Sequence, residues 1–420
     1  MPLTRKLTNG LPIILAPMHD TQAITVFILV KVGSRYESAK VSGISHFIEH
    51  LLFKGGKKRR TSLAITKALD SVGAEYNAFT GKDLTGYYIK VAKKHLPLAL
   101  DVLSDMVLSP LFDAKELEKE RGVIIEEINM YEDNPLMGID SYFEEQLFLG
   151  HPLSRKISGE KEDILRISRK DIIDYYKKNY LQGKIIVGLG GNLPTDVLEL
   201  TEKFFGKQKL KNQAIPFQKF VSQQQKPRFK IIAKDNQQIQ VMMGFPAYNQ
   251  NHPLHYATAL LSIMLGGNMS SRLFTEIREK RGLCYFVRAS YDAYEDTGAF
   301  YISAGLDQSR LVLALTTIKA ELNKIKKIPP QKTEITKAKE FLKGKMILNL
   351  EDSDDIIAWL VKQQLFTGKM ETLEQKLAKI DAVTEAQIAL AAKNIIDWKK
   401  FSLAMIGSDK QQKDILEIFK

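Results

Sequence analysis

The stretch Ser42–Gly56 reads S-G-I-S-H-F-I-E-H-L-L-F-K-G-G, and the rest of the chain is organised around it. Its apolar residues recur at helical spacing, Ser42 can serve as the N-cap, and the two glycines at its end supply a stop. This pattern predicts a helix of about three turns. His46 and His50 are four residues apart and therefore share one face of that helix.

The two histidines predict a metal site. Imidazole nitrogens one helical turn apart can bind one Zn²⁺ at about 2.0–2.1 Å each, and Glu49 beside them can reach a water on the open metal position. The pattern H-x-x-E-H is only moderately specific, because composition alone produces it in a small fraction of chains. The alternative is a pair of packed or solvated helix-face histidines near a glutamate.

A second predicted helix offers the missing ligand. The stretch Asp113–Asn134 reads D-A-K-E-L-E-K-E-R-G-V-I-I-E-E-I-N-M-Y-E-D-N, with an aspartate as N-cap and an Asn-Pro pair at its end. Glu120 and Glu127 are seven residues apart and lie on the same face. A catalytic zinc site needs three protein ligands, so Glu127 is a candidate third ligand and Glu120 a candidate for orienting a histidine or the water. Spacing alone does not choose Glu127 over Glu126.

These motifs resemble those of the insulinase/pitrilysin family of zinc metallopeptidases, the inverzincins, and specifically its short, processing-peptidase-like branch. The family pattern has H-x-x-E-H, then a ligand glutamate 77 residues after the second histidine and another functional glutamate seven residues before that ligand. Glu127 and Glu120 occupy these positions. The words G-S-R-Y-E-S from Gly33 and R-G-V-I-I-E-E-I from Arg121 also match, so the resemblance covers essentially the whole chain.

The resemblance implies a zinc metalloendopeptidase that hydrolyses peptides or short unfolded polypeptides. One Zn²⁺ per chain would be held by His46, His50 and Glu127, would polarise the scissile carbonyl, and would lower the pKa of its bound water to about 7. Glu49 would take the water proton as general base and deliver it to the leaving amine. Glu120 would support the ligands.

The stretch Ala74–Ala92 is predicted to form two strands around a turn at residues 81–83. In the family, the strand that corresponds to Glu75–Thr80 is the edge to which a substrate adds as an extra strand, with the residues matching Asn77 and Ala78 lining the site. Main-chain pairing of this kind binds an extended segment with little regard for its side chains. Without the resemblance, the stretch predicts an ordinary hairpin.

The second half carries R-E-K-R-G-L-C-Y at residues 278–285. The resemblance implies that Arg278 and Tyr285 reach across an interdomain cleft to the substrate backbone and the oxyanion, where one donor is worth about 2.7–4 kcal/mol. Without the family, they are a solvated helix charge and a strand residue. Cys284 is expected to be a small packed residue and not a nucleophile.

Length and composition bound the architecture. A chain of 420 residues with 44% hydrophobic content can bury more than one core. The polar, glutamine-rich segment 211–227 is predicted to link a metal-binding domain at 1–210 to a domain without metal ligands at 228–420. The expected fold class is α+β, with two homologous domains that each pack a mostly antiparallel sheet against helices and together form a clamshell.

Late landmarks in the two halves repeat at a nearly constant offset. Gly150 corresponds to Gly368 and Gly191 to Gly407, which predicts two structurally similar halves. The second copy of the metal helix, A-L-L-S-I-M-L-G-G from Ala259, has no histidine. Only the first half is therefore expected to carry the metal.

Charge and cysteine content limit the classes of binding partner and the cellular compartment that the chain is expected to have. The net charge of +12 is spread along the chain, and its densest cluster, residues 57–60, lacks interleaved aromatics, so nucleic-acid binding is a minor alternative. A single cysteine, the absence of a signal-like N-terminus and the absence of a long apolar run predict a soluble, cytoplasmic protein. The resemblance implies a homodimer or a heterodimer with a related subunit.

The main alternative to a peptidase is a non-catalytic family paralogue that acts as a substrate-binding or scaffold subunit of a hetero-oligomer.

The remaining histidines lack ligand spacing and are expected to be structural or surface residues: His19, His95, His151, His252 and His255.

Overall fold

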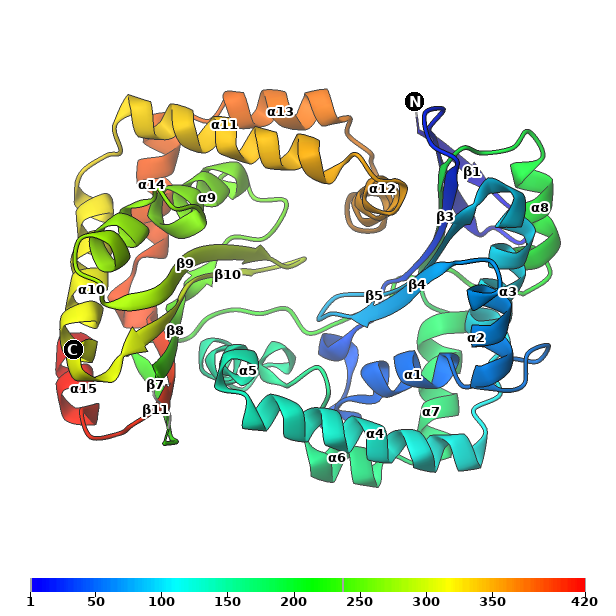
Figure 1. The fold of residues 1–420 in the computed structure, drawn as a ribbon, viewed down its shortest axis with the longest axis horizontal. Helices are drawn as coiled ribbons and strands as arrows, with labels where there is room; N and C mark the ends of the chain where they lie inside the picture. The colour runs from blue at the N-terminus through cyan, green and yellow to red at the C-terminus, as the bar shows by residue number, and fades with distance from the viewer. Residues whose placement is uncertain (1, 236–237, 420) are drawn as a thin grey trace. The chain divides into compact units, whose positions relative to one another are not determined.

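The computed structural model describes residues 2–235 and 238–419, which form two compact units (Figure 1). Each unit is assembled from three segments of the chain rather than from one continuous half. The first unit comprises Met1–Asn129, Arg155–Gln218 and Leu348–Glu371. The second comprises Met130–Ser154, Lys219–Ile347 and Thr372–Lys420.

The first unit contains a six-stranded sheet with the order β1-β2-β6-β3-β5-β4. Its pairs are antiparallel except for the parallel pair of β2 and β6. Among the described strands, β4 pairs only with β5, so it forms an edge of the sheet, as predicted for this segment. The bounds of the strands are Leu3–Lys6 (β1), Pro12–Pro17 (β2), Ala23–Val30 (β3), Glu75–Thr80 (β4), Thr85–Ala92 (β5) and Ile185–Gly191 (β6).

The second unit repeats this topology with five strands in the order β7-β11-β8-β10-β9. Its one parallel pair, β7 with β11, corresponds to β2 with β6. The equivalent strands β6 and β11 both end in a glycine with positive φ, 120° at Gly191 and 154° at Gly407. The prediction of two similar α+β halves is therefore confirmed. The bounds are Arg228–Ala233 (β7), Gln238–Ala247 (β8), Cys284–Ala293 (β9), Gly298–Asp307 (β10) and Ser402–Gly407 (β11).

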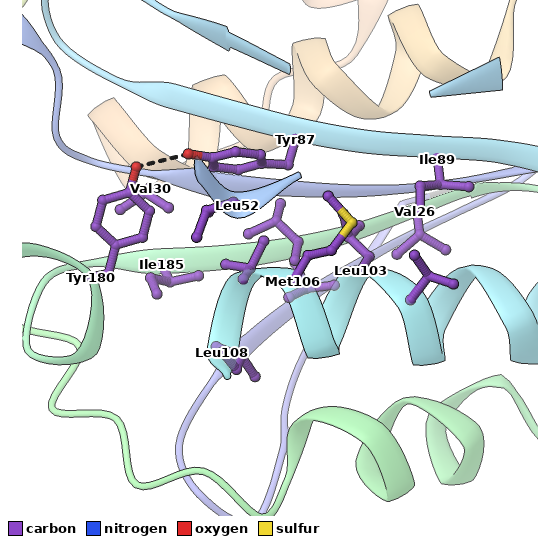
Figure 2. Packing of buried hydrophobic residues seen from close by; sticks show 14 of the residues in the cluster. Val26, Val30, Leu52, Tyr87, Ile89, Leu103, Met106, Leu108, Tyr180 and Ile185 are labelled. Carbon is purple, nitrogen blue, oxygen red and sulfur yellow. Dashed lines mark hydrogen bonds between the residues drawn. The ribbon is translucent and has the colours of Figure 1, made fainter. Parts of the chain in front are cut away.

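One face of the first sheet packs on helices α1 and α3. Figure 2 shows part of this core, in which Leu103 and Met106 of α3 lie below Val26 of β3. The hydroxyls of Tyr87 and Tyr180 are hydrogen-bonded at 2.8 Å within it. The helices of this part of the chain are α1 (Ile44–Leu52), α2 (Ser62–Asp70), α3 (Leu96–Leu108), α4 (Ala114–Asp133), α6 (Lys161–Arg166), α7 (Arg169–Tyr176) and α8 (Val197–Phe205).

The opposite face of the first sheet is covered by α12 (Ser353–Thr367), a helix from the C-terminal half. Figure 1 shows this orange helix near the blue strand β3, against which it packs. Gly188 and Gly190 of β6 leave room for it, since a Cβ at Gly188 would come within 2.4 Å of Val361 and 2.6 Å of Ile357.

The second sheet receives a helix from the N-terminal half in the same way. The helix α5 (Pro135–Leu147) packs against β7, β8 and β11. This exchange of α5 and α12 explains why the compact units are discontinuous, whereas the sequence suggested continuous domains. The other helices of this unit are α9 (His255–Ser262), α10 (Leu311–Lys327), α11 (Lys332–Asn349), α13 (Leu373–Asp381), α14 (Glu385–Ile395) and α15 (Gln412–Phe419), with π-helical turns at Ile263–Gly267 and Phe274–Glu279.

The predicted linker lies in an irregular segment. Between the end of α8 at Phe205 and the start of β7 at Arg228, the chain has no helix or strand. In the described part of the chain, no helix has both the length and the apolar character needed to span a bilayer.

Candidate metal centre

The helix α1 is fixed at its N-terminus by a buried glutamate. Its N-cap is Gly43, with φ of 89°, and not Ser42 as the sequence suggested. The Glu37 carboxylate accepts the backbone N–H groups of Gly43 at 2.7 Å and Ser45 at 2.8 Å, which satisfies two of the donors that a helix start leaves open. A side chain at residue 43 would also come within 2.5 Å of the Ser158 carbonyl oxygen, so only glycine fits there.

The three predicted metal ligands come together. The Nε2 atoms of His46 and His50 are 3.2 Å apart, and Glu127 Oε2 lies 3.6 Å from the first and 3.5 Å from the second. Ligand atoms at about 2.0–2.1 Å around a tetrahedral zinc ion are about 3.3 Å apart. The observed triangle therefore has the size of one face of a zinc coordination tetrahedron.

The chemistry of these three groups fits a cation as well as their spacing does. Two neutral imidazoles cannot both direct lone pairs at one point without a proton or a metal between them. The side chains of His46, His50 and Glu127 are 11%, 21% and 23% exposed, so the site is shielded yet open to a fourth ligand. Among the residues that the structure describes, no other group of three histidine, cysteine or acidic side chains is placed to hold a metal.

Glu120, the residue predicted to support the ligands, contacts His50. Its Oε1 lies 2.9 Å from His50 Nδ1, while its Oε2 lies 2.7 Å from the ammonium of Lys54. A carboxylate on Nδ1 fixes the tautomer whose Nε2 is free to bind metal. Lys54 was not among the predicted site residues, although its place four residues after His50 was a usable signal.

The protonation of each histidine and glutamate at the site depends on the charges of its neighbours. Burial opposes charging of His50, but its hydrogen bonds with Glu120 and Glu127 outweigh burial and raise its pKa to about 9. Burial and the neighbouring His50 charge lower the pKa of His46 to about 4. The hydrogen bond from His50 lowers the pKa of Glu127. The carboxylates of Glu120 and Glu127 therefore place negative charge next to the imidazole nitrogens, which favours a bound cation.

Glu49 lies on the same helix, half-buried, and its carboxylate oxygen Oε2 accepts a hydrogen bond from the Thr80 hydroxyl. Burial raises the pKa of Glu49, and the bond from Thr80 acts in the opposite direction. Thr80 is the last residue of β4 and was not among the predicted site residues. Nothing in its local sequence indicates this contact, which joins positions 31 residues apart.

The predicted substrate-binding residues lie on the edge strand β4. Asn77 is exposed and Ala78 half-buried. The Asn77 side chain accepts the Ala78 backbone N–H at 2.8 Å. Because this N–H is bonded to a side chain, the alternation of an antiparallel ladder places the main-chain groups of Ala78 on the free side of the strand.

Arg278 and Tyr285 belong to the second unit. Arg278 lies in the π-helical turn Phe274–Glu279, with its guanidinium 4.9 Å from the ring centroid of Phe274 and 5.4 Å from that of Tyr285. Tyr285 is 71% exposed. Burial raises the pKa of the neighbouring Cys284 thiol to about 11, which fits a packed residue rather than a nucleophile.

The remaining histidines engage other partners. His151 is buried and accepts the Leu153 backbone N–H at 3.2 Å. His252 stacks on Tyr248 with ring centroids 3.8 Å apart, and the Nδ1 atom of His255 lies 3.1 Å from the Tyr291 hydroxyl.

Comparison with protein families places the site within the matched region. Residues 13–161 match the model described as insulinase (peptidase family M16), and residues 166–342 match the model described as peptidase M16 inactive domain. All five acidic and histidine residues of the candidate metal centre fall in the first of these regions, and none falls in the second.

Relatives that match nearly the whole chain are named zinc proteases. An uncharacterized zinc protease of Bacillus subtilis (strain 168) is 31% identical over 399 residues, which cover 95% of this chain and 96% of the relative. An uncharacterized zinc protease of Streptomyces coelicolor is 33% identical over 413 residues, covering 96% of this chain and 90% of the relative.

Solved structures show the same fold. A protease from Helicobacter pylori superposes with a TM-score of 0.89 at 27% identity, over 97% of this chain and 99% of that one. A Pseudomonas fluorescens structure titled peptidase M16 inactive domain superposes with a TM-score of 0.88 at 18% identity, over 97% of this chain and 98% of that one. From its family matches and whole-length relatives, this chain belongs to the insulinase family, peptidase family M16.

Proposed function

We propose that this chain is a zinc-dependent endopeptidase that hydrolyses peptides or short unfolded polypeptides. The observation that carries the proposal is the triangle of His46 Nε2, His50 Nε2 and Glu127 Oε2, whose edges of 3.2–3.6 Å suit one zinc ion. A zinc ion bound there supplies a Lewis acid, which polarises a carbonyl and makes water a stronger acid.

The side chains around the triangle have distinct roles in this proposal. Glu49 accepts a proton from the attacking water and delivers it to the amine of the departing peptide. Glu120 holds the His50 ring through Nδ1, and Lys54 holds Glu120 from the other side. The two histidine rings are thereby kept in the orientation that metal binding needs.

Substrate binding is proposed to use the free edge of β4. An extended peptide paired with this edge would bond main chain to main chain, with Asn77 and Ala78 in contact with it. Asn77 would release the Ala78 N–H that it now occupies, at small cost, because one hydrogen bond replaces another. Arg278 and Tyr285 are proposed to donate to the substrate backbone and the oxyanion.

The second candidate is a non-catalytic subunit that only binds substrate. The matched description "inactive domain" refers to residues 166–342, which contain no metal-site residue. The presence of Glu49 favours catalysis, because a binding subunit has no need of a base beside its metal ligands.

The test is cleavage of a mixed quenched-fluorescent peptide library by the purified protein. We expect the wild type to cut, a chelator to stop it and added zinc to restore it, while Glu49→Gln binds zinc and is inert. Glu127→Gln should lose both zinc and activity, whereas Glu126→Gln, an exposed neighbour, should behave as wild type. A wild type that binds no zinc would support the second candidate, whereas one that binds zinc but cleaves only with a related subunit present would be a catalytic subunit that needs its partner.

We also propose that the chain works as a homodimer or as a heterodimer with a related subunit in the cytoplasm. The single cysteine suits a reducing compartment, since the chain can form no internal disulfide. Light scattering of the purified protein, alone and with a co-expressed relative, measures the oligomeric state.

A further inference from the structure

The strand β4 presents one of its faces to the metal helix. Tyr76 and Ala78 pack against the core that contains α1, whereas Phe79 packs against the cluster that contains α12. Side chains alternate along a strand, so Thr80 lies on the same face as Tyr76 and Ala78. This places the Thr80 hydroxyl toward α1 from the end of the strand that is proposed to receive substrate.

On that face, the Thr80 Oγ1 atom donates a hydrogen bond to Glu49 Oε2. Within the described residues, no other side chain or backbone group donates a hydrogen bond to the Glu49 carboxylate. Ordering a glutamate side chain costs rotamer freedom. A hydrogen bond to a carboxylate is strong enough to offset that cost and to select one conformation.

The donor itself is rigid. Thr80 is β-branched, which restricts its χ1 angle, and its backbone is paired with Thr85 of β5. The turn that follows is closed by the Gly81 N–H, which donates to the Leu84 carbonyl oxygen at 2.8 Å. The hydroxyl therefore holds the carboxylate from a fixed point in the sheet and not from a mobile loop.

We infer that Thr80 is a positioning residue for the general base Glu49. Its hydroxyl holds Glu49 Oε2, so that Glu49 Oε1 remains available to take the proton of the attacking water. The inference deepens the proposed function and rests on it. Because Thr80 ends the edge strand β4, the base and a peptide paired with that strand share one rigid frame. The pairing of a peptide with β4 would then also fix the position of its backbone relative to the Glu49 carboxylate.

The kinetic test compares Thr80→Val, which keeps the side-chain shape and removes the donor, with Thr80→Ser, which restores the donor. We expect Thr80→Val to lower kcat by about 10- to 100-fold, as misplaced catalytic groups do, with KM changed less than about twofold. Thr80→Ser should stay within about threefold of wild type, because its hydroxyl can form the same bond. Bound zinc, measured by atomic absorption, should equal that of wild type in both variants.

Thr85→Val is the matched control. Thr85 faces Thr80 across the hairpin, and its buried hydroxyl donates to the Val32 carbonyl oxygen at 2.8 Å. Its loss should lower the melting temperature and leave kcat near the wild-type value. A Thr80→Val variant with wild-type kcat, or one that changes KM alone, would overturn the inference.

A structural readout separates this inference from the proposed function. Crystal structures of the zinc-loaded wild type and Thr80→Val should show Glu49 in one conformation bonded to Thr80 in the first and in several conformations in the second. If Glu49 keeps the same single conformation in Thr80→Val, the inference is wrong whether or not the wild type cleaves peptides. If Glu49 becomes disordered in Thr80→Val while the wild type cleaves nothing, Thr80 does order the Glu49 side chain and it is the proposed function that fails.

Discussion

At the scale of single residues, the candidate metal centre depends on groups that do not themselves touch the metal position. His50 is held by Glu120, and Glu120 is held by Lys54 at 2.7 Å. Lys54 fixes Glu120 and Glu120 fixes His50, so a substitution at Lys54 should alter the position of the His50 Nε2 atom.

The first prediction follows from this chain of contacts. Lys54→Met should weaken zinc affinity, because Glu120 loses its second anchor, but by less than the loss of about 10- to 100-fold expected when a direct partner of a metal ligand is removed. Competition against a chromophoric zinc chelator measures the change. Lys57→Met, at an exposed lysine of the following loop, is the control and should leave the affinity unchanged. Equal affinities for the two variants would show that Lys54 does not support Glu120.

At the scale of the elements, α1 starts from a buried carboxylate. Glu37 is 4% exposed, and burial raises its pKa from 4.5 to about 7 although the amides of Gly43 and Ser45 favour its charge. A carboxyl with a raised folded-state pKa binds protons more readily in the folded than in the unfolded chain. Its stabilising effect is therefore complete below about pH 4.5 and is lost as the pH rises through about 7.

The second prediction uses this sign. Between pH 4.5 and 8, the free energy of unfolding of the wild type should fall relative to that of Glu37→Gln, by up to about 3 kcal/mol. Urea denaturation of both proteins without metal, at several pH values, measures the difference. Other titrating groups are common to both proteins and cancel. A difference that does not vary with pH would mean that Glu37 titrates normally.

The third prediction concerns the contact between β6 and α12. Gly188→Ala should destabilise the protein by about 1–3 kcal/mol, because its Cβ would overlap Val361 and Ile357. Gly344→Ala is the control, since nothing lies within 4 Å of its Cβ in α11, and it should stabilise by about 0.5–1 kcal/mol. Both values come from urea denaturation. Adding Val361→Ala should recover part of the loss at Gly188, and failure to do so would argue against this overlap.

At the scale of the whole molecule, the two sheets each depend on a helix from the other half of the sequence. The helix α12 seals a cluster on the first sheet that includes Phe27, Leu29 and Ile186. The helix α5 seals the matching face of the second sheet, with Phe143 against Met242 and Ala404. Neither half of the sequence can bury both faces of its own sheet.

The fourth prediction follows. A fragment of residues 1–218 should expose the apolar face that α12 covers, bind the dye ANS and fail to bind zinc with wild-type affinity. Co-expression with residues 219–420 should restore both properties. As a control, the intact protein cleaved after folding at a protease site within residues 211–227 should keep its zinc. A monomeric fragment 1–218 that folds and binds zinc normally would contradict this account.

Much of the candidate site could be predicted because its pattern is local. His46, Glu49 and His50 share one helix, and Glu120 and Glu127 share another, so helical periodicity makes them candidates. The choice of Glu127 over Glu126 rested on the family resemblance. Thr80, Lys54 and Glu37 were missed because their roles depend on contacts between elements. The carboxylate of Glu37 replaces the N-cap expected from Ser42, and local sequence gives no reason to prefer a buried acid from an upstream loop.

The amino-acid sequence was enough to predict the metal helix, the edge hairpin, the repeat of one topology in two halves and the residues that are candidates for holding a metal. These properties follow from periodicity and residue chemistry, which act over short distances along the chain. The sheets that α5 and α12 cover, and the hydroxyl that reaches Glu49, became visible only in the folded chain. An apolar face must be buried, but its composition does not say which element will cover it. The covering element is the one whose shape fits, as α12 fits against the glycines of β6.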